Sequence, residues 1–127
     1  MIIKHKYARN ARETDLVMAT STPWGPSQYS KQITRGIVLY GTAGHGGIHV
    51  SPTMLAKMPE PLRAIGGNYC GPGNEGWFEE DCAWCAVALA FPERFEHRDL
   101  DCAKRTLKNY YPEAYAKLYE TETSETV

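Results

Sequence analysis

A glycine-rich segment between two β-type runs, at residues 35–52, constrains the fold of this chain more than any other feature. Residues 37–40 (IVLY) form a β-branched and aromatic run closed by a glycine, and residues 48–50 (IHV) form a shorter run of the same kind. The pattern predicts a β-hairpin whose connection, residues 41–47, has four glycines around His45. Glycine permits positive φ and the close approach of other atoms. The connection is therefore either a loop that contacts a ligand or a flexible hairpin loop with an incidental histidine.

A further strand precedes this hairpin in the prediction. Residues 29–34 alternate larger side chains with polar neighbours, which is typical of a half-buried strand, so residues 29–50 form a three-stranded antiparallel meander. The 127 residues, 43% of them apolar, supply material for one core. We expect an N-terminal arm or edge strand at residues 1–20, a single globular domain at residues 21–120 and a frayed tail at residues 121–127.

The charge balance limits the classes of partner. The chain has 14 basic and 15 acidic residues and a formal net charge of −1, which favours neither nucleic acid nor an anionic membrane surface. No apolar stretch approaches the length of a membrane span, and the opening MIIKHKYARNARETD lacks the apolar region of a secretory signal. We therefore expect a cytoplasmic protein without a membrane partner. We do not expect a nucleic-acid partner, and the sequence leaves open whether the chain forms homo-oligomers.

Short helical turns and a long loop are expected after the hairpin. Ser51 can cap a helix that has Pro52 at its first position, and two further prolines end it before another turn at residues 62–65. Residues 66–76 hold five glycines and one proline in eleven positions. Such a composition excludes regular structure and predicts a long loop of the kind that often carries function.

Residues 77–91 are predicted to form the central helix. Apolar residues recur on two stripes at three- and four-residue steps: Phe78, Cys82, Cys85 and Leu89 on one, and Trp77, Trp84, Ala88 and Phe91 on the other. A helix that is apolar on two sides must pack on both. A helix capped by Asp99 and a last helix starting at Pro112 follow. The predicted fold class is α+β, with a three-stranded antiparallel meander packed against a central helix and two C-terminal helices.

Three consecutive acids, Glu79, Glu80 and Asp81, fall in the first turn of this predicted helix. One explanation is structural, because acidic side chains there complement the positive end of the helix dipole by about 0.3–1 kcal/mol each. The other is functional, because three adjacent carboxylates repel one another and lie beside the long glycine-rich loop. Successive helical residues point about 100° apart, so at most one or two of the three would enter a site.

The chain has four cysteines, namely Cys70, Cys82, Cys85 and Cys102. A reducing compartment disfavours structural disulfides, so free thiols or metal ligands are expected. Cys82 and Cys85 have the spacing of a zinc knuckle that the other cysteines, His45 or His49 could complete, but the pair lies in an apolar helix, where cysteine packs as a small hydrophobe. We expect no metal and no cofactor. We also expect a buried Cys82 whose replacement by serine costs about 1–3 kcal/mol.

Trp24 and His45 are the side chains best suited to contact a ligand. Trp24 lies in the rigid turn STPWGP, where it is either a core anchor or a stacking surface. His45 could act as a general base oriented by one of the three acids. The chain has no nucleophile elbow and no phosphate-binding loop to support this catalytic interpretation. The other histidines, His5, His49 and His97, are expected to be structural or superficial.

Four motifs taken together resemble a known family. They are TPWG at residues 22–25, HGGI at residues 45–48 with the following Ser51-Pro52, GWFEEDCAW at residues 76–84, and TLKNYYP at residues 106–112 with the following Ala114-Tyr115. In combination they resemble DUF7007, a family of small uncharacterised domains of bacteria, plasmids and phages, over residues 21–118. This chain has Tyr110 where tryptophan is common in the family, and Gly44 where a serine often precedes the histidine. If that serine is a nucleophile in relatives, its absence argues against an enzyme here.

The resemblance implies an accessory protein of a mobile element that counters host defence, in the host cytoplasm if it is phage-encoded. Together with the residues above, it leads us to expect a module that binds a small polar or nucleotide-derived ligand. The expected binding residues are His45, Gly46 and Gly47 through their amides, Trp24, Trp77, Glu79, Glu80 and Asp81. Two alternatives stay open. One is a hydrolase-type enzyme with His45, Glu79 and Glu80 as candidate catalytic residues, and the other is a protein–protein inhibitor of a host factor.

Overall fold

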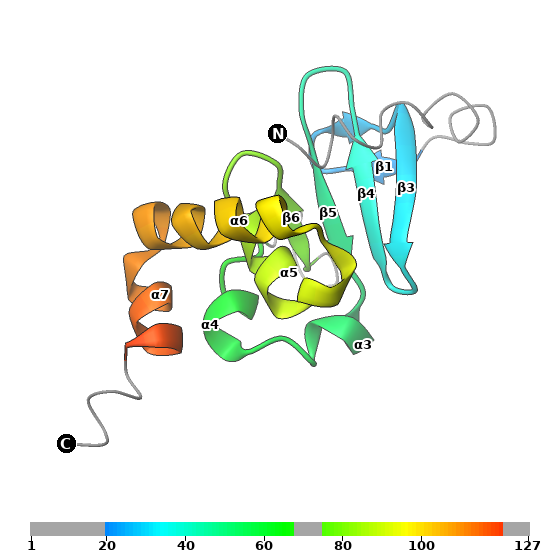
Figure 1. Cartoon of the computed structure of the whole chain (residues 1–127). Coiled ribbons are helices and arrows are strands. Elements are labelled where there is room, and N and C mark those ends of the chain that lie inside the picture. The colour runs from blue at the N-terminus through cyan, green and yellow to red at the C-terminus, as the bar shows by residue number, and fades with distance from the viewer. Residues whose placement is uncertain (1–19, 68–74, 121–127) are drawn as a thin grey trace.

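The computed structural model describes residues 20–67 and 75–120 (Figure 1). The elements in chain order are β1 (Ser21–Thr22), β2 (Gly25–Pro26), β3 (Tyr29–Thr34), β4 (Ile37–Gly41), β5 (Gly46–Val50), α3 (Pro52–Leu55), α4 (Glu60–Arg63), β6 (Trp77–Glu79), α5 (Trp84–Ala90), the 3-10 helix η1 (Pro92–Arg94), α6 (His97–Tyr110) and α7 (Pro112–Tyr119). The predictions for the N-terminal arm with His5, for the tail and for Cys70 in the glycine-rich loop lie outside the described residues. None of the helices in the described ranges combines the length and apolar character that a bilayer crossing requires.

The main sheet has four antiparallel strands in the order β3-β4-β5-β6 (Figure 1). The α+β class is confirmed, and β3, β4 and β5 lie where they were expected, with Leu39 of β4 opposite Ile48 of β5. The sheet is not the predicted three-stranded meander, because β6 adds a fourth strand that places Phe78 opposite Ile48. β1 and β2 form a separate two-stranded ribbon. β5 is therefore an interior strand whose backbone is paired on both sides.

The prediction of a helix beginning at residue 77 is wrong. Trp77–Glu79 is strand β6, and the helix α5 starts only at Trp84. Gly76 directs the chain alongside β5: its φ is +88°, a value that glycine adopts freely, and its carbonyl accepts a hydrogen bond from Val50 N at 2.9 Å. In a strand the adjacent Trp77 and Phe78 point to opposite faces of the sheet. The three acids consequently lie at the end of a strand and in the turn after it, outside α5.

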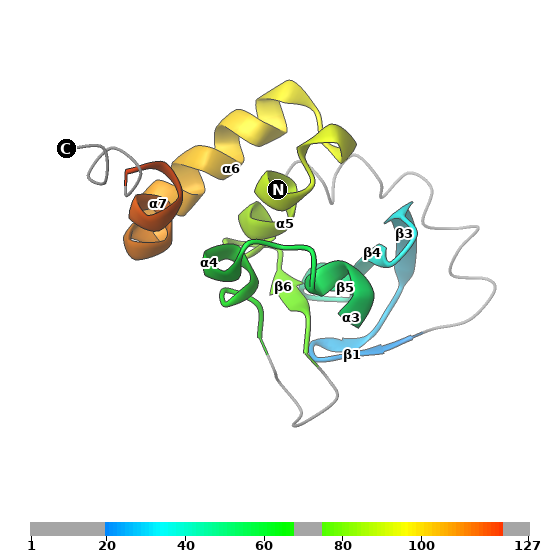
Figure 2. The same cartoon turned by 90° about the horizontal axis from the view of Figure 1, so that it is seen from below.

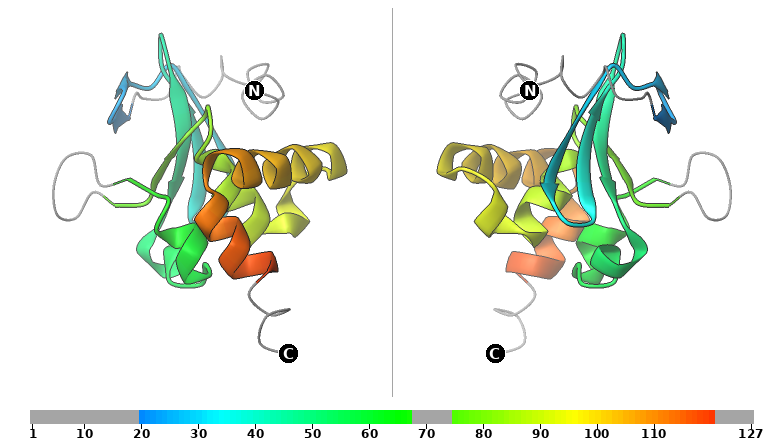
Figure 3. Two further views of the ribbon diagram at one scale, coloured as in Figure 1. Left: turned by 90° about the vertical axis from the view of Figure 1, so that its left-hand side faces the viewer. Right: turned by 90° about the vertical axis from the view of Figure 1, so that its right-hand side faces the viewer.

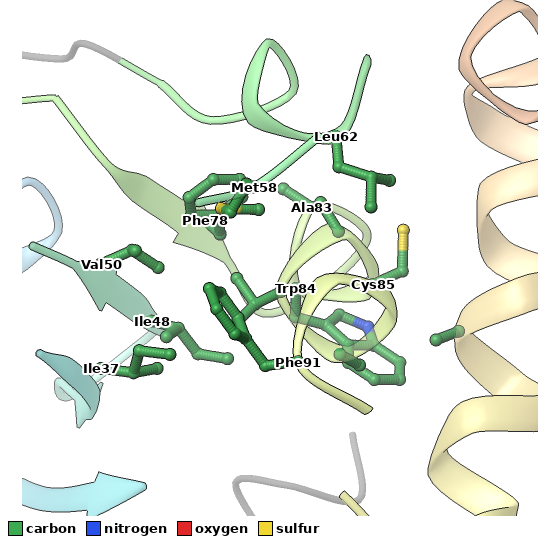
Figure 4. Close-up of a cluster of buried hydrophobic side chains, with 14 of the residues drawn as sticks. Ile37, Ile48, Val50, Met58, Leu62, Phe78, Ala83, Trp84, Cys85 and Phe91 are labelled. Atoms are coloured by element: carbon green, nitrogen blue, oxygen red, sulfur yellow. The ribbon is translucent and has the colours of Figure 1, made fainter. Parts of the chain in front are cut away.

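The helices cover one face of the sheet. α5 lies against this face, α6 packs on α5 from the far side, and α7 packs against α6 (Figures 2 and 3). The inner face of the sheet consists of the buried side chains that join this helical layer: Ile37, Leu39, Ile48, Val50 and Phe78. With Trp84, Cys85 and Phe91 of the α5 region, and with Met58 and Leu62, they make one core (Figure 4). α5 is thus packed on two sides, as its apolar sequence requires.

The predictions of helix ends are partly right. Ser51 caps α3, because its hydroxyl accepts a hydrogen bond from Met54 N at 3.3 Å, and Pro112 starts α7. The turn predicted at residues 62–65 overlaps the helix α4, which begins earlier, at Glu60, and includes Pro61. Asp99 does not cap α6, since the helix begins two residues earlier, at His97, and Asp99 is buried in its first turn.

The cysteines differ in burial. Cys85 is fully buried, and the pKa of its thiol is raised to about 12. The largest cause is burial, and the nearby Cys82, Cys102 and Glu79 add smaller contributions. Cys82 is only partly buried, so the prediction of a buried Cys82 is wrong. The physical reason is its position in the turn before α5, at the rim of the core instead of on a helical stripe. A thiol as buried as Cys85 stays protonated and acts as a packing group.

Candidate functional site

The outer face of the sheet points away from α5. By the alternation of side chains along a strand, its residues are Val38 and Tyr40 of β4, Gly47 and His49 of β5, and Trp77 and Glu79 of β6. The β1–β2 ribbon lies on this side of the sheet (Figure 3). Ring centroids of Tyr40 and His49 lie 5.7 Å and 4.5 Å from that of Trp77. The outer face is therefore aromatic and polar, whereas the inner face is mainly aliphatic.

Trp24 lies over the outer face, on the turn between β1 and β2. The hydroxyl of Thr22 shapes this turn, because it donates to the carbonyl of Gly25 at 2.6 Å and accepts from Trp24 N at 3.1 Å. The indole is edge-on to Trp77, with ring centroids 5.6 Å apart and planes at 89°. It also fills the space above Gly47, where an added Cβ would collide with the ring. Glycine is thus required at this position by an aromatic ring of the same chain.

His45 is held at the end of the β4–β5 connection by Thr42. The backbone N–H and the hydroxyl of Thr42 donate to the carbonyl oxygen of His45 at 2.7 and 2.8 Å, and His45 N donates to the same hydroxyl at 3.2 Å. Trp24 packs against the imidazole, with ring centroids 5.4 Å apart and planes at 65°. The side chain of His45 is 30% exposed. A ligand can therefore reach the ring while the backbone holds it in place.

Two carboxylates flank the imidazole, one at each nitrogen. Glu79 Oε2 lies 3.6 Å from Nε2, and Glu80 Oε2 lies 3.8 Å from Nδ1. Both distances exceed the length of an N–H···O hydrogen bond, about 2.7–3.2 Å, so neither carboxylate is hydrogen-bonded to the imidazole and both ring nitrogens can bond to a ligand. We call the group of His45, Glu79, Glu80 and Asp81 the acidic corner. It lies at the end of the sheet where β5 begins and β6 ends.

Glu79 also builds the turn that leads into α5. Its Oε1 accepts hydrogen bonds from the backbone N–H groups of Cys82 and Ala83 at 2.7 and 2.8 Å, and its Oε2 accepts one from Asp81 N at 2.7 Å. A carboxylate with three such donors is fixed in position. Glu79 is therefore a rigid neighbour of His45, and the turn that it holds brings the two acids that follow it to the same corner.

His45, Glu80 and Asp81 have the donor types of a cation site. One ligand atom from each lies within 4.8 Å of the other two. An imidazole nitrogen with two carboxylate oxygens suits a divalent cation, whose remaining positions would go to water or to a ligand. No cysteine of the described ranges belongs to a group of this kind. The expectation that the chain binds no metal stays a prediction.

The structure brings together most of the residues predicted to bind a ligand. His45, the two tryptophans and the three acids lie at one end of the outer face. The two glycines differ, because Gly46 and Gly47 lie inside β5 and the carbonyl of Gly46 accepts a hydrogen bond from Glu80 N at 2.9 Å. Since β5 is paired on both sides, the backbone of these glycines serves the sheet. Their role as amide donors to a ligand stays a prediction.

Reasoning from the sequence overlooks Tyr40 and His49 as parts of this face. Both alternate with inner-face residues along their strands, and this period of two is the signal that identifies them. His49 is half-buried. Its burial lowers the pKa of the imidazole, and a hydrogen bond with the backbone of Glu75 opposes this shift. At neutral pH His49 is therefore an uncharged hydrogen-bonding group beside Trp77.

The fold and the site define a small α+β domain in which one face of an antiparallel sheet is covered by helices and the other carries aromatic rings beside a histidine–carboxylate corner. The chain belongs to the family DUF7007, described as a domain of unknown function, whose sequence pattern matches residues 17–127. The resemblance seen in the motifs is thereby confirmed. No curated protein and no solved structure matches the chain. This description assigns no activity to the family.

Proposed function

We propose that this protein binds a small polar, nucleotide-derived ligand at the acidic corner. The observation that carries the proposal is the position of His45, whose ring nitrogens face the carboxylates of Glu79 and Glu80 while its ring meets Trp24. Small-molecule sites combine a few convergent polar groups with an apolar or aromatic surface. Both kinds of group are present here in a single cluster that α5 does not cover.

The charge of the corner indicates which part of such a ligand it takes. Three carboxylates surround one imidazole. Two like charges about 4 Å apart repel by about 1 kcal/mol in water and about 4 kcal/mol near a protein surface. The repulsion near a protein surface exceeds the contribution of one neutral hydrogen bond, which is about 0.5–1.5 kcal/mol. The ligand therefore presents the N–H or O–H donors of its base or sugar to the acids, and any phosphate lies away from them.

Trp24 is the proposed stacking surface. It is partly exposed, and the hydrogen bonds of Thr22 fix the turn that carries it. Stacking of a base on an aromatic side chain contributes about 1–3 kcal/mol and tolerates different bases. Selectivity among bases then comes from the donors that meet Glu80 and Asp81.

We place this binding activity in the cytoplasm, in an accessory protein of a phage or plasmid that acts against host defence. This setting rests on the resemblance in the motifs and not on the fold. Binding alone would remove the ligand from circulation in that setting, so no turnover is required.

A hydrolase-type enzyme is the alternative that the same geometry favours. A histidine that acts as a general base is oriented by a neighbouring carboxylate, and Glu79, fixed by three backbone donors, lies beside Nε2 of His45. The residue before His45 is Gly44, which offers no hydroxyl. The attacking group would therefore be water, activated at the other ring nitrogen, and the ligand would be cleaved.

A protein–protein inhibitor is the third proposal. Tyr110 is 65% exposed and lies beside a groove between α4 and the junction of α6 and α7. Exposed aromatic residues are enriched at protein interfaces. A pull-down from host lysate with the wild type and Tyr110→Ser tests this use of the surface. Capture that survives the substitution contradicts it.

The main test is titration calorimetry with a panel of nucleosides and nucleotides, followed by chromatography of each mixture. We expect heat that fits stoichiometric binding of one ligand, and recovery of that ligand intact. Binding should be at least about tenfold weaker in His45→Gln, because the imidazole contacts are lost. His97→Gln replaces an exposed histidine at the start of α6 and serves as the matched control, with binding expected at the wild-type level.

The outcomes separate the candidates. Product that appears only with an intact His45 moves the conclusion to the hydrolase. Unchanged affinity in His45→Gln, or no heat across the panel at millimolar ligand, contradicts the proposal. Each titration is repeated with a strong chelator. Binding that disappears in chelator would assign a cation to His45, Glu80 and Asp81 and overturn the expectation of no metal.

A further inference from the structure

A pocket of about 500 Å³ opens beside the end of β5, where the chain enters α3. Its lining residues are Val50, Pro52, Leu55 and Ala56 on an apolar side and His49, Arg63 and Glu75 on a polar side. The volume falls within the range of small-molecule sites, about 300–1,000 Å³. None of the four residues of the acidic corner lines it, so the pocket is a second feature of the molecule.

Segments that are distant in the sequence build this pocket. The Ser51 cap fixes the start of α3, which places Leu55 and Ala56 on one wall. Arg63 is the last residue of α4. The hydrogen bond from Val50 N to the carbonyl of Gly76 brings the neighbouring Glu75 to the opposite wall. The site is therefore held by elements of the fold on each side.

Arg63 is the residue of the pocket that most needs a partner. One nitrogen of its guanidinium, Nη1, donates to the carbonyl of Met58 at 2.9 Å. No acidic side chain in residues 20–67 and 75–120 forms an ion pair with it, although the residue is half-buried. A guanidinium has five N–H donors in a planar fork that matches a carboxylate or phosphate group. The donors left after the bond to Met58 are available to an oxyanion in the pocket.

The other polar groups of the pocket restrict what accompanies the oxyanion. His49 is uncharged at neutral pH, since burial lowers the pKa of its imidazole. Its single N–H donates to the backbone of Glu75, so its other ring nitrogen can accept one hydrogen bond. Glu75 is exposed at the rim, and its carboxylate repels an anion that comes close. The oxyanion must therefore lie on the Arg63 side, with the rest of the ligand against Pro52 and Leu55.

We infer that this pocket binds a small molecule that carries a carboxylate or phosphate group on a compact ring or apolar body. Arg63 takes the oxyanion, and the wall of α3 takes the body. Bidentate contacts between arginine and an oxyanion are among the strong hydrogen bonds of proteins. The site uses neither His45 nor Trp24, so this inference goes beyond the proposed function and does not depend on it.

The test is a two-dimensional amide NMR titration with three probes of one shape: benzoate, phenyl phosphate and benzyl alcohol. We expect one or both anions to shift the amides of His49, Leu55, Ala56 and Arg63 and to bind at least about tenfold more tightly than the neutral alcohol. The comparison of benzoate with phenyl phosphate shows which oxyanion fits. Arg63→Gln should reduce anion affinity to that of the alcohol, and Arg94→Gln, an exposed arginine of η1, should leave it unchanged.

Arg63→Gln also removes the hydrogen bond to the carbonyl of Met58 and can thereby destabilise the protein, so a second variant is needed. Leu55→Trp fills the pocket from the α3 wall and keeps Arg63, so it should abolish binding of all three probes. The inference is overturned if the alcohol binds as tightly as both anions, if the anions shift amides elsewhere, or if anion binding survives Leu55→Trp. His45→Gln should not alter probe binding, so failure at the acidic corner and failure at this pocket are distinguishable.

Discussion

The two faces of the sheet come from the same strands but have different surroundings. On the inner face Leu39 and Ile48 are 1% and 0% exposed and pack in the core with the helical layer. On the outer face the residues next to them in sequence, Tyr40 and His49, are half-buried, and the β1–β2 ribbon with Trp24 lies on that side. One face is therefore sealed, and the other remains in contact with solvent.

This difference separates stability from recognition within one sheet. Full burial of a large apolar side chain contributes about 1.5–3 kcal/mol, so the inner face supplies much of the folding free energy. On the outer face Trp77 is also buried, at 5% exposure, but Trp24, His45 and His49 are only half-buried. The open end of this face can therefore hold a histidine between two carboxylates at little cost to the fold. Substitutions on the inner face should therefore reduce stability more than substitutions on the outer face.

The largest expected effect is on the inner face. Phe78→Ala removes a side chain that is 0% exposed and packs over Gly66, so the free energy of unfolding should fall by about 3–5 kcal/mol. Val38→Ala, a truncation on the outer face, is the control and should cost less than about 1 kcal/mol. Urea denaturation measures both. Equal losses would show that the two faces contribute equally to stability.

The contact between Trp24 and Gly47 gives the next effect. In Gly47→Ala the new Cβ would collide with the indole and with the carbonyl of Phe78, so the ribbon must shift at a cost of about 1–3 kcal/mol. Gly44→Ala is the matched control, because no atom lies within 4 Å of a Cβ at that position. Thermal melts of the two variants compare them. A Gly47→Ala protein as stable as Gly44→Ala would mean that Trp24 does not pack there.

The two cysteines of the CxxC sequence, Cys82 and Cys85, allow the same comparison between a rim position and a core position. Cys85→Ser buries a hydroxyl in the core and should cost about 1–3 kcal/mol, whereas Cys82→Ser, at the rim, should cost less than about 0.5 kcal/mol. Alkylation followed by mass spectrometry should label Cys82 in the native protein and Cys85 only after unfolding, because burial raises the pKa of Cys85 to about 12. Similar reactivity of both thiols would contradict the assignment.

The smallest effect is the pH dependence that His49 contributes. Its pKa is lowered in the folded state, so the unfolded chain binds the proton more readily and stability rises with pH across this titration. Stability should therefore decline as the pH falls below about 6.5, the ordinary pKa of histidine, and level off below the folded pKa. The melting temperature of the wild type and of His49→Gln is measured against pH. The difference between the two curves isolates the contribution of His49. The opposite slope would place a charged His49 in the folded protein.

The locally encoded parts of the fold can be predicted from the sequence. The β-branched run at residues 37–40 and the glycines after it specify the β4–β5 hairpin, and Ser51 and Pro112 mark helix starts because their effects are confined to a few residues. The stretch at residues 77–79 is different. Its residues fit the hydrophobic period of a helix as well as that of a strand. It forms a strand because β5 offers an edge for pairing, and no local pattern encodes a contact between segments so far apart in the chain.

The candidate site shows the same division. The sequence places His45 in one glycine-rich turn and the three acids beside a later glycine-rich loop, and their residue types predicted that they would share a site. The role of Glu79 was not predictable, because it depends on three backbone donors in a turn that was assigned to a helix. Gly47 was predictable as a point of close approach, although the atoms that approach belong to Trp24. The Arg63 pocket was not predictable, because its walls come from three separate segments.

The most direct test of the account is the location of the amide shifts caused by the tightest-binding nucleoside of the calorimetric panel. We expect changes at the amides of His45 and Glu80 and at the indole of Trp24, with the amides of Leu39 and Val87 in the core unchanged. Changes confined to the helical layer, or no difference between the acidic corner and the core, would contradict the claim that the outer face is the binding surface.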